Sequence, residues 1–244
     1  MLGQHFALVI TTALLLPMLG SVIIFSILTI ALLYARARIF AYPVHKPMLL
    51  NLFLSWIPII CVSIALFFFL TSLTTQLWLV ILLLCIWFVF FPNSTYLVTE
   101  FHHLKEEVNT VPFWFDTIVI LSLALCGVLL GGFSLLLIHR ILDLYLAPVF
   151  SWLVIVVYLF LSNIGIYIGR FLRFNSWDVL TNPLGLTKGI LAIFKERQKS
   201  RSLLLFSTLF TLFLLAFYLF LYSAVTPITW ILEMLIQRYP KLPF

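Results

Sequence analysis

Hydrophobic residues along the chain are gathered into six long runs, which short polar links separate. A helix needs about 20 residues to cross the hydrocarbon core of a bilayer, and each run is that long. Because backbone N–H and C=O groups in lipid must be paired within the segment, such runs fold as helices. We predict an all-α, polytopic membrane protein, a bundle of six transmembrane helices forming a single integral-membrane domain over residues 1–244. The predicted helices cover approximately residues 6–34, 49–71, 76–97, 113–138, 149–168 and 203–225.

The link between the fifth and sixth runs contains a further segment with a helical pattern. Over residues 184–199, Leu186 and Ile190 fall on one side and Lys188 and Lys195 fall elsewhere. This arrangement is typical of an amphipathic helix that lies on the membrane surface. We predict an interfacial helix at approximately 184–199, and a shorter candidate of the same kind at residues 227–238.

The composition supports the membrane assignment and excludes other classes. Only 9% of the residues are charged and 64% are hydrophobic, whereas soluble domains carry about 25% charged residues. The formal net charge is +6. The Lys and Arg residues that give this charge lie between the apolar runs, where we expect them to contact lipid head groups rather than nucleic acid. The predicted partners are therefore the lipid bilayer, anionic lipid head groups and a small anionic ligand, with no nucleic acid. Cys61, Cys85 and Cys126 all lie inside apolar runs, so we predict neither a disulfide nor a metal site from them.

The distribution of Arg and Lys predicts the orientation in the membrane. Most of them lie in the first, third and fifth links, and the fifth link holds the largest share. By the positive-inside rule these links are cytoplasmic and both termini are extracytoplasmic. We predict a multi-pass protein of the cell membrane with its polar motif loops on the cytoplasmic side.

Two polar strings, residues 92–104 and 165–178, end the third and fifth apolar runs. Polar groups kept at membrane depth usually have partners or a function. Both strings fall on the predicted cytoplasmic side, and Asp116 at the start of the fourth helix faces the same side. The sequence therefore predicts one polar site at the cytoplasmic ends of helices 3, 4 and 5.

The first string combines a helix-distorting proline with spaced polar residues. Pro92 lacks a backbone donor, so we predict a kink there and a cavity open to the cytoplasm, bounded by this break. Asn93, Tyr96 and Thr99 follow at a spacing of three and form one stripe on a helix. They either line a ligand cavity or pair with backbone groups freed by Pro92, and the sequence leaves both interpretations open.

Glu100 and His103 share a helix face at the end of this string, as residues i and i+3. Carboxylate-bridged metal sites use two Glu-x-x-His motifs, and this chain has one. Asp116 or Asp178 would have to complete a metal site, so we predict no metal. Glu100, His103 and Asp178 remain candidates for acid–base chemistry. The cofactor, if any, is unknown.

The second string contains a pair of arginines beside further polar residues. Arg170 and Arg173 are spaced as i and i+3, and a guanidinium binds phosphate or carboxylate in a bidentate manner. They either clamp an anion or anchor the helix to lipid head groups and internal carboxylates. Tyr167 and Asn175 flank them as further ligand-binding candidates.

Small residues predict close helix packing at two places. Gly127, Gly131 and Gly132 lie in the fourth run, and Gly165 and Gly169 have a G-x-x-x-G spacing in the fifth. Nucleotide-binding loops and the usual hydrolase motifs do not occur in the sequence, which argues against a nucleotide-driven pump or a standard hydrolase.

The two strings resemble those of a bacterial integral-membrane family catalogued as domain of unknown function 1361. The resemblance covers roughly residues 50 to 225 and includes Glu100 where the family usually has Asp. It implies that the motif residues belong to one site, and it implies no activity. The matching positions are Pro92, Asn93, Tyr96, Thr99, Glu100, His103 and Leu104, then Trp114 and Asp116, then Gly165, Tyr167, Gly169, Arg170, Phe171, Arg173, Asn175, Ser176, Trp177 and Asp178.

Three functions fit these observations. The first is a protein that binds or transports a small anionic solute or lipid head group through Arg170 and Arg173. The second is a non-catalytic assembly or regulatory subunit, whose polar strings hold its own helices together. The third is an enzyme acting on a lipid-linked substrate, with His103 as the acid–base group.

Overall fold

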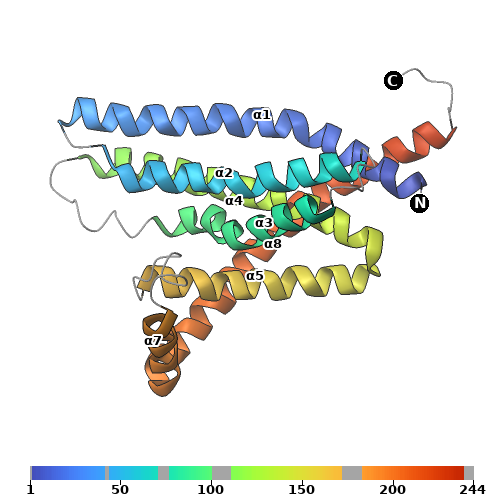
Figure 1. The fold of residues 1–244 in the computed structure, drawn as a ribbon. Helices are drawn as coiled ribbons and strands as arrows, with labels where there is room; N and C mark the ends of the chain where they lie inside the picture. Colours follow the sequence, from blue (N-terminus) through green and yellow to red (C-terminus); the bar gives the residue numbers. More distant parts are fainter. Residues whose placement is uncertain (1, 42–43, 71–76, 101–110, 172–182, 239–244) are drawn as a thin grey trace. The chain divides into compact units, whose positions relative to one another are not determined.

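A computed structural model describes residues 2–41, 44–70, 77–100, 111–171 and 183–238 (Figure 1). Most of these residues are helical, and none of them lies in a strand. The helices are α1 (Leu2–Ile39), α2 (Lys46–Leu70), α3 (Leu77–Tyr96), α4 (Phe113–Tyr145), α5 (Pro148–Phe171), α7 (Pro183–Lys195) and α8 (Arg197–Arg238).

Six of these helices, all except α7, are long and apolar enough to cross a membrane. The predicted all-α, polytopic membrane fold with six transmembrane helices is therefore confirmed. The orientation of the termini and the cytoplasmic side of the loops stay predictions.

Several helices extend beyond the apolar runs that predicted them. The sixth predicted helix ends at residue 225, but α8 continues through Pro227 to Arg238, so the tail is not a separate interfacial helix. The predicted interfacial helix at 184–199 comprises α7 and the first residues of α8, with a bend at Glu196. Once a helix has formed, each added residue gains one backbone hydrogen bond whether its side chain is apolar or polar. A helix therefore need not end where the apolar run ends.

α3 runs through Pro92 to Tyr96, in agreement with the helix predicted at 76–97, and the kink at Pro92 stays a prediction. The irregular backbone lies after that point, where Leu97 to Glu100 form a 3₁₀ turn. A proline removes one hydrogen bond from a helix, and neighbouring helices and hydroxyl side chains make this tolerable in membrane helices. The cavity expected beside the break stays a prediction.

The chain forms two compact units. Unit 1 comprises residues 1–147 and 219–244, and unit 2 comprises residues 148–218. α8 contributes its first half to unit 2 and its second half to unit 1.

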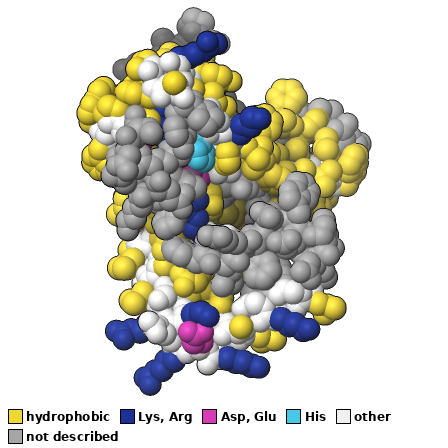
Figure 2. Space-filling view, turned by 90° about the vertical axis from the view of Figure 1, so that its left-hand side faces the viewer, with side chains coloured by type: hydrophobic (Ala, Val, Ile, Leu, Met, Phe, Trp, Pro, Cys, Tyr) yellow, Lys and Arg dark blue, Asp and Glu magenta, His cyan; other side chains and the backbone are white. Residues whose placement is uncertain are grey.

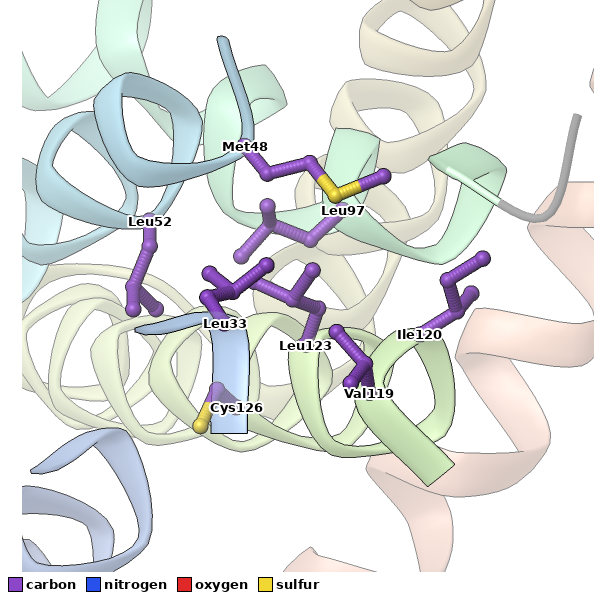
Figure 3. Close-up of a cluster of buried hydrophobic side chains, with 8 residues drawn as sticks. All are labelled: Leu33, Met48, Leu52, Leu97, Val119, Ile120, Leu123 and Cys126. Carbon is purple, nitrogen blue, oxygen red and sulfur yellow. The ribbon is translucent and has the colours of Figure 1, made fainter. Parts of the chain in front are cut away.

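Helix α4 is the centre of unit 1. It contacts α1, α2 and α3, while α2 also packs along α3 (Figure 1). In the most apolar segment of α4, 78% of the residues are buried inside the protein. The corresponding share is 17–44% in the other five candidate spans. One hydrophobic cluster joins α1, α2, α4 and the turn after α3 (Figure 3), and it consists of Leu33, Met48, Leu52, Leu97, Val119, Ile120, Leu123 and Cys126.

Glycine allows α3 and α4 to approach closely. A Cβ atom at Gly127 would overlap the Ser94 carbonyl oxygen, and one at Gly131 would lie 3.4 Å from the Ser94 Cβ. The predicted close packing at these two glycines is therefore confirmed. The same prediction for Gly165 is wrong within unit 2, where a Cβ would meet no atom within 4 Å.

Unit 2 is held by contacts among α5, α7 and the first half of α8. Tyr167, Ile193 and Leu203 form a buried cluster that contains one residue from each helix. Nearer the middle of α5, the Asn163 amide donates a hydrogen bond of 2.9 Å to the Thr211 hydroxyl on α8. The carboxyl end of α5, the end of α7 and the start of α8 therefore lie together in this unit.

Candidate functional site

A buried ion pair joins α1 to α4 at one end of unit 1. The Arg36 guanidinium donates from Nε to Asp116 Oδ1 at 2.6 Å and from Nη2 to Oδ2 at 3.3 Å, so it engages both carboxylate oxygens. The two residues are only 6% and 9% exposed. Each lies about one turn from a member of the hydrophobic cluster, Leu33 on α1 and Val119 on α4. Asp116 is thus a predicted site residue, whereas Arg36 was not singled out in the sequence.

A second polar pair lies at the same end and joins α2 to the turn after α3. Asn51 Nδ2 donates to Glu100 Oε1 at 2.8 Å, and Glu100 is 1% exposed. Leu52 follows Asn51 directly, and Leu97 precedes Glu100 by three residues. Both leucines belong to the hydrophobic cluster in Figure 3. Both predicted carboxylates therefore border one core and have partners from α1 and α2.

The polar stripe of α3 makes local bonds to the backbone. Asn93, Thr95 and Thr99 each donate to the carbonyl oxygen three residues earlier, at 3.2, 3.3 and 2.7 Å. Ser94 instead donates 2.9 Å to the Ser55 carbonyl oxygen on α2. The bonds of Asn93 and Thr99 go to the Phe90 and Tyr96 carbonyl oxygens, whereas Pro92 removes the helical hydrogen bond to the Phe88 carbonyl, so both interpretations of the stripe stay predictions.

Unit 2 carries a strongly basic end. Tyr167 is buried in the cluster described above, and Arg170 follows it by about one turn at the end of α5. Beyond Arg170, residues 183–201 contain five exposed basic side chains and one carboxylate, Glu196, which pairs with Lys199 at 2.6 Å. Figure 2 shows dark-blue Lys and Arg side chains gathered at its lower edge. We call Arg170, Lys188, Lys195, Arg197, Lys199 and Arg201 the basic end.

A pocket of about 790 Å³ lies along the first three turns of α8, within unit 2. At its polar part it is lined by Arg197 and Arg201, with Gln198 and Ser200 between them. Farther along the helix its lining becomes apolar. The remaining lining residues are Leu204, Leu205, Thr208 and Leu209.

A polar cluster that the sequence analysis missed joins the other end of α4 to α8 in unit 1. The Tyr222 ring stacks on the His139 ring, with ring centroids 5.3 Å apart. The Arg140 guanidinium carbon lies 5.6 Å from the centroid of the Tyr222 ring. Arg140 also donates 3.2 Å to the Thr226 hydroxyl, and His139 lies 3.7 Å from Asp143. The available signal was a His-Arg-x-x-Asp sequence at the end of an apolar run, because ionisable residues within spans rarely lack a role.

The remaining predicted site residues fall outside the described ranges. They are His103, Arg173, Asn175 and Asp178. Within the described part of the chain, no three His, Cys, Asp or Glu side chains are grouped so that they could hold a metal ion. The described geometry thus places Glu100 and Asp116 in unit 1, and Tyr167 and Arg170 in unit 2.

The model of one protein family, described as "Protein of unknown function (DUF1361)", matches residues 50–217. The chain belongs to this family. The match extends from α2 into α8, so the DUF1361 region includes both polar strings, Asp116 and the basic end. No curated protein and no solved structure matches the chain. The DUF1361 assignment and the six apolar helices together describe a multipass membrane protein of unknown activity, and its bacterial origin stays a prediction.

Proposed function

We propose that this DUF1361 protein binds an anionic, phosphate-bearing ligand at the basic end of unit 2. The ligand is either the head group of a membrane lipid or a small free anion. In the predicted orientation this end faces the cytoplasm, at the carboxyl end of the fifth transmembrane helix. Arg170 belongs to it, and Arg173 and Asn175 follow Arg170 three and five residues later in the sequence.

The charge balance of residues 183–201 carries the proposal. Five basic side chains are exposed there, and the single carboxylate, Glu196, pairs with Lys199. A basic residue near an anionic leaflet contributes about 1 kcal/mol to membrane attraction. Several such residues on a short segment would therefore give strong, salt-sensitive binding of anions.

The carboxylates of unit 1 support a structural role instead. Asp116 pairs with Arg36 and Glu100 accepts from Asn51, all four from different elements of one helix bundle. These contacts favour, as a second candidate, the non-catalytic assembly or regulatory function, in which polar residues hold the bundle together. The enzyme hypothesis depends on His103, which lies outside the described residues, and it remains a hypothesis.

Native mass spectrometry of the protein purified in detergent tests the proposal. Phosphatidylglycerol, phosphatidylcholine and inorganic phosphate are added separately, and retained mass is compared. One variant replaces Lys188, Lys195, Arg197, Lys199 and Arg201 by glutamine. A control for basic residues outside the basic end replaces Arg38 and Lys46, which are exposed side chains of unit 1.

We expect the wild type and the control to retain phosphatidylglycerol or phosphate in preference to phosphatidylcholine. The five-residue variant is expected to lose this preference, because its exposed positive charges are gone. Equal retention of the anionic probes by wild type and variant would contradict the proposal.

A further inference from the structure

The pocket on α8 has a chemical gradient along its length. Its lining residues recur at steps of three and four, as Arg197, Arg201, Leu204 and Thr208 do, and therefore share one helix face. The first turn of this face presents two guanidinium groups. The next two turns present leucine side chains, and Leu205 and Leu209 are 51% and 64% exposed in the protein.

The dimensions of this face fit one lipid molecule. From Arg197 to Leu209 the helix rises by about 18 Å, and one leaflet contributes about 15 Å to the hydrocarbon core. The candidate span of α8 begins at Arg197, so the leucines follow the arginines into the bilayer. A head group beside the arginines would thus place its acyl chain along the leucines.

The two arginines suit a phosphate better than the lysines of the same segment. A guanidinium donates two hydrogen bonds in a fixed planar geometry, whereas an ammonium acts as a point charge. Arg197 and Arg201 are i and i+4 on one face, and Ser200 and Gln198 add hydrogen-bonding groups beside them. Lys188 and Lys195 belong to α7 and do not line the pocket.

We propose that the pocket on α8 is a site for a single anionic glycerophospholipid, whose phosphate binds Arg197 and Arg201 and whose acyl chain lies on Leu204, Leu205 and Leu209. This inference rests on the proposed function, because it names the ligand of the same basic end. It adds that the ligand is a bilayer lipid rather than a free anion, and that one part of the basic end binds it.

Three paired variants, measured by native mass spectrometry in detergent, test the inference. Arg197→Gln/Arg201→Gln removes the two pocket charges. Lys188→Gln/Lys195→Gln removes the same charge outside the pocket and is the matched control. The probes are phosphatidylglycerol with 16-carbon chains and phosphatidylglycerol with 6-carbon chains.

The third variant, Leu205→Ala/Leu209→Ala, shortens the apolar part of the pocket without changing its charge. All three variants are compared with wild type for expression and for thermal unfolding in detergent. This comparison separates loss of lipid from loss of fold.

We expect the arginine variant to lower the affinity for one tightly retained long-chain lipid by roughly tenfold or more, given about 1 kcal/mol for each charge. The lysine variant should lower it by less, because Lys188 and Lys195 add charge to the basic end but do not line the pocket. The leucine variant should weaken binding of the long-chain lipid more than that of the short-chain lipid, because only the long chain extends as far as Leu209, about 12 Å beyond Arg201 along the helix.

Equal losses in the arginine and lysine variants would overturn the pocket while leaving a diffuse anionic surface, and hence the proposed function, in place. Loss in the arginine variant with no effect of the leucines would overturn the lipid-chain assignment. Unchanged retention in both charge variants would overturn the inference, and unchanged retention in the five-residue variant would overturn the proposed function as well.

Discussion

The ion pair between Arg36 and Asp116 is expected to be a main determinant of the stability of unit 1. We consider Arg36→Gln and Asp116→Asn, which each remove one charge and keep a polar side chain of similar size. Arg36 and Asp116 are 6% and 9% exposed, and their shortest contact is 2.6 Å. Each single variant therefore leaves one charge buried beside a neutral amide.

Removing one partner of a buried ion pair costs about 3–5 kcal/mol, because the remaining charge has lost its compensation. We expect each single variant to lower the free energy of unfolding by about that amount. The double variant leaves no unpaired charge, so its loss should be smaller than the sum of the single losses. The expected coupling energy is about 1–3 kcal/mol.

Unfolding by sodium dodecyl sulfate in mixed micelles, followed by circular dichroism, measures these differences. Arg38→Gln is the matched control, because Arg38 lies on the same turn of α1 and is exposed. It should unfold as the wild type does. Additive losses in the double variant, or single variants as stable as the wild type, would refute the role assigned to the pair.

Three further predictions concern helix packing and helix ends, and all use the same unfolding assay. Gly127→Ala should cost about 1–3 kcal/mol by overpacking, because its Cβ would overlap the α3 backbone, whereas Gly131→Ala should cost less; equal effects would contradict the model of close approach. Ala41→Gly should stabilise the protein by up to about 1 kcal/mol, since Ala41 has a φ of 52° and glycine adopts this conformation without strain; a destabilised variant would exclude that conformation. Tyr222→Leu should lose about 1–2 kcal/mol of stacking and cation–π energy, whereas Tyr222→Phe should retain most of it; equal losses would assign the effect to the hydroxyl group instead of the ring.

The first polar string, residues 92–104, shows what the sequence pattern could and could not predict at the candidate site. Its spacing identified Asn93, Thr99 and Glu100 as residues with partners or a function, and the structure gives each of them a hydrogen-bond partner. The pattern could not choose between a ligand and the protein as the source of that partner. The helix predicted at 76–97 does continue through Pro92, and how a helix accommodates a proline depends on the groups packed around it.

The basic end shows the opposite case, because its evidence is largely local. The density of Lys and Arg in residues 183–201 and the i, i+4 spacing of Arg197 and Arg201 can be read from the chain. The structure adds the bend at Glu196, which starts α8 at Arg197, and the pocket along that helix face. These details decide which of the basic residues share a surface with the leucines.

The sequence by itself determined the class of the protein, the number of transmembrane helices and the close packing at Gly127 and Gly131, whereas the partner of these glycines, α3, came from the tertiary structure. These properties depend on the length and composition of single segments, and the bilayer sets the required length. Only the tertiary structure assigned Arg36 to Asp116, Asn51 to Glu100 and Tyr222 to the end of α4. In a membrane protein the lipid and the interior are both apolar, so the hydrophobic pattern does not reveal which face of a helix points inward. Partners 49 to 83 positions apart are therefore decided by how the helices pack.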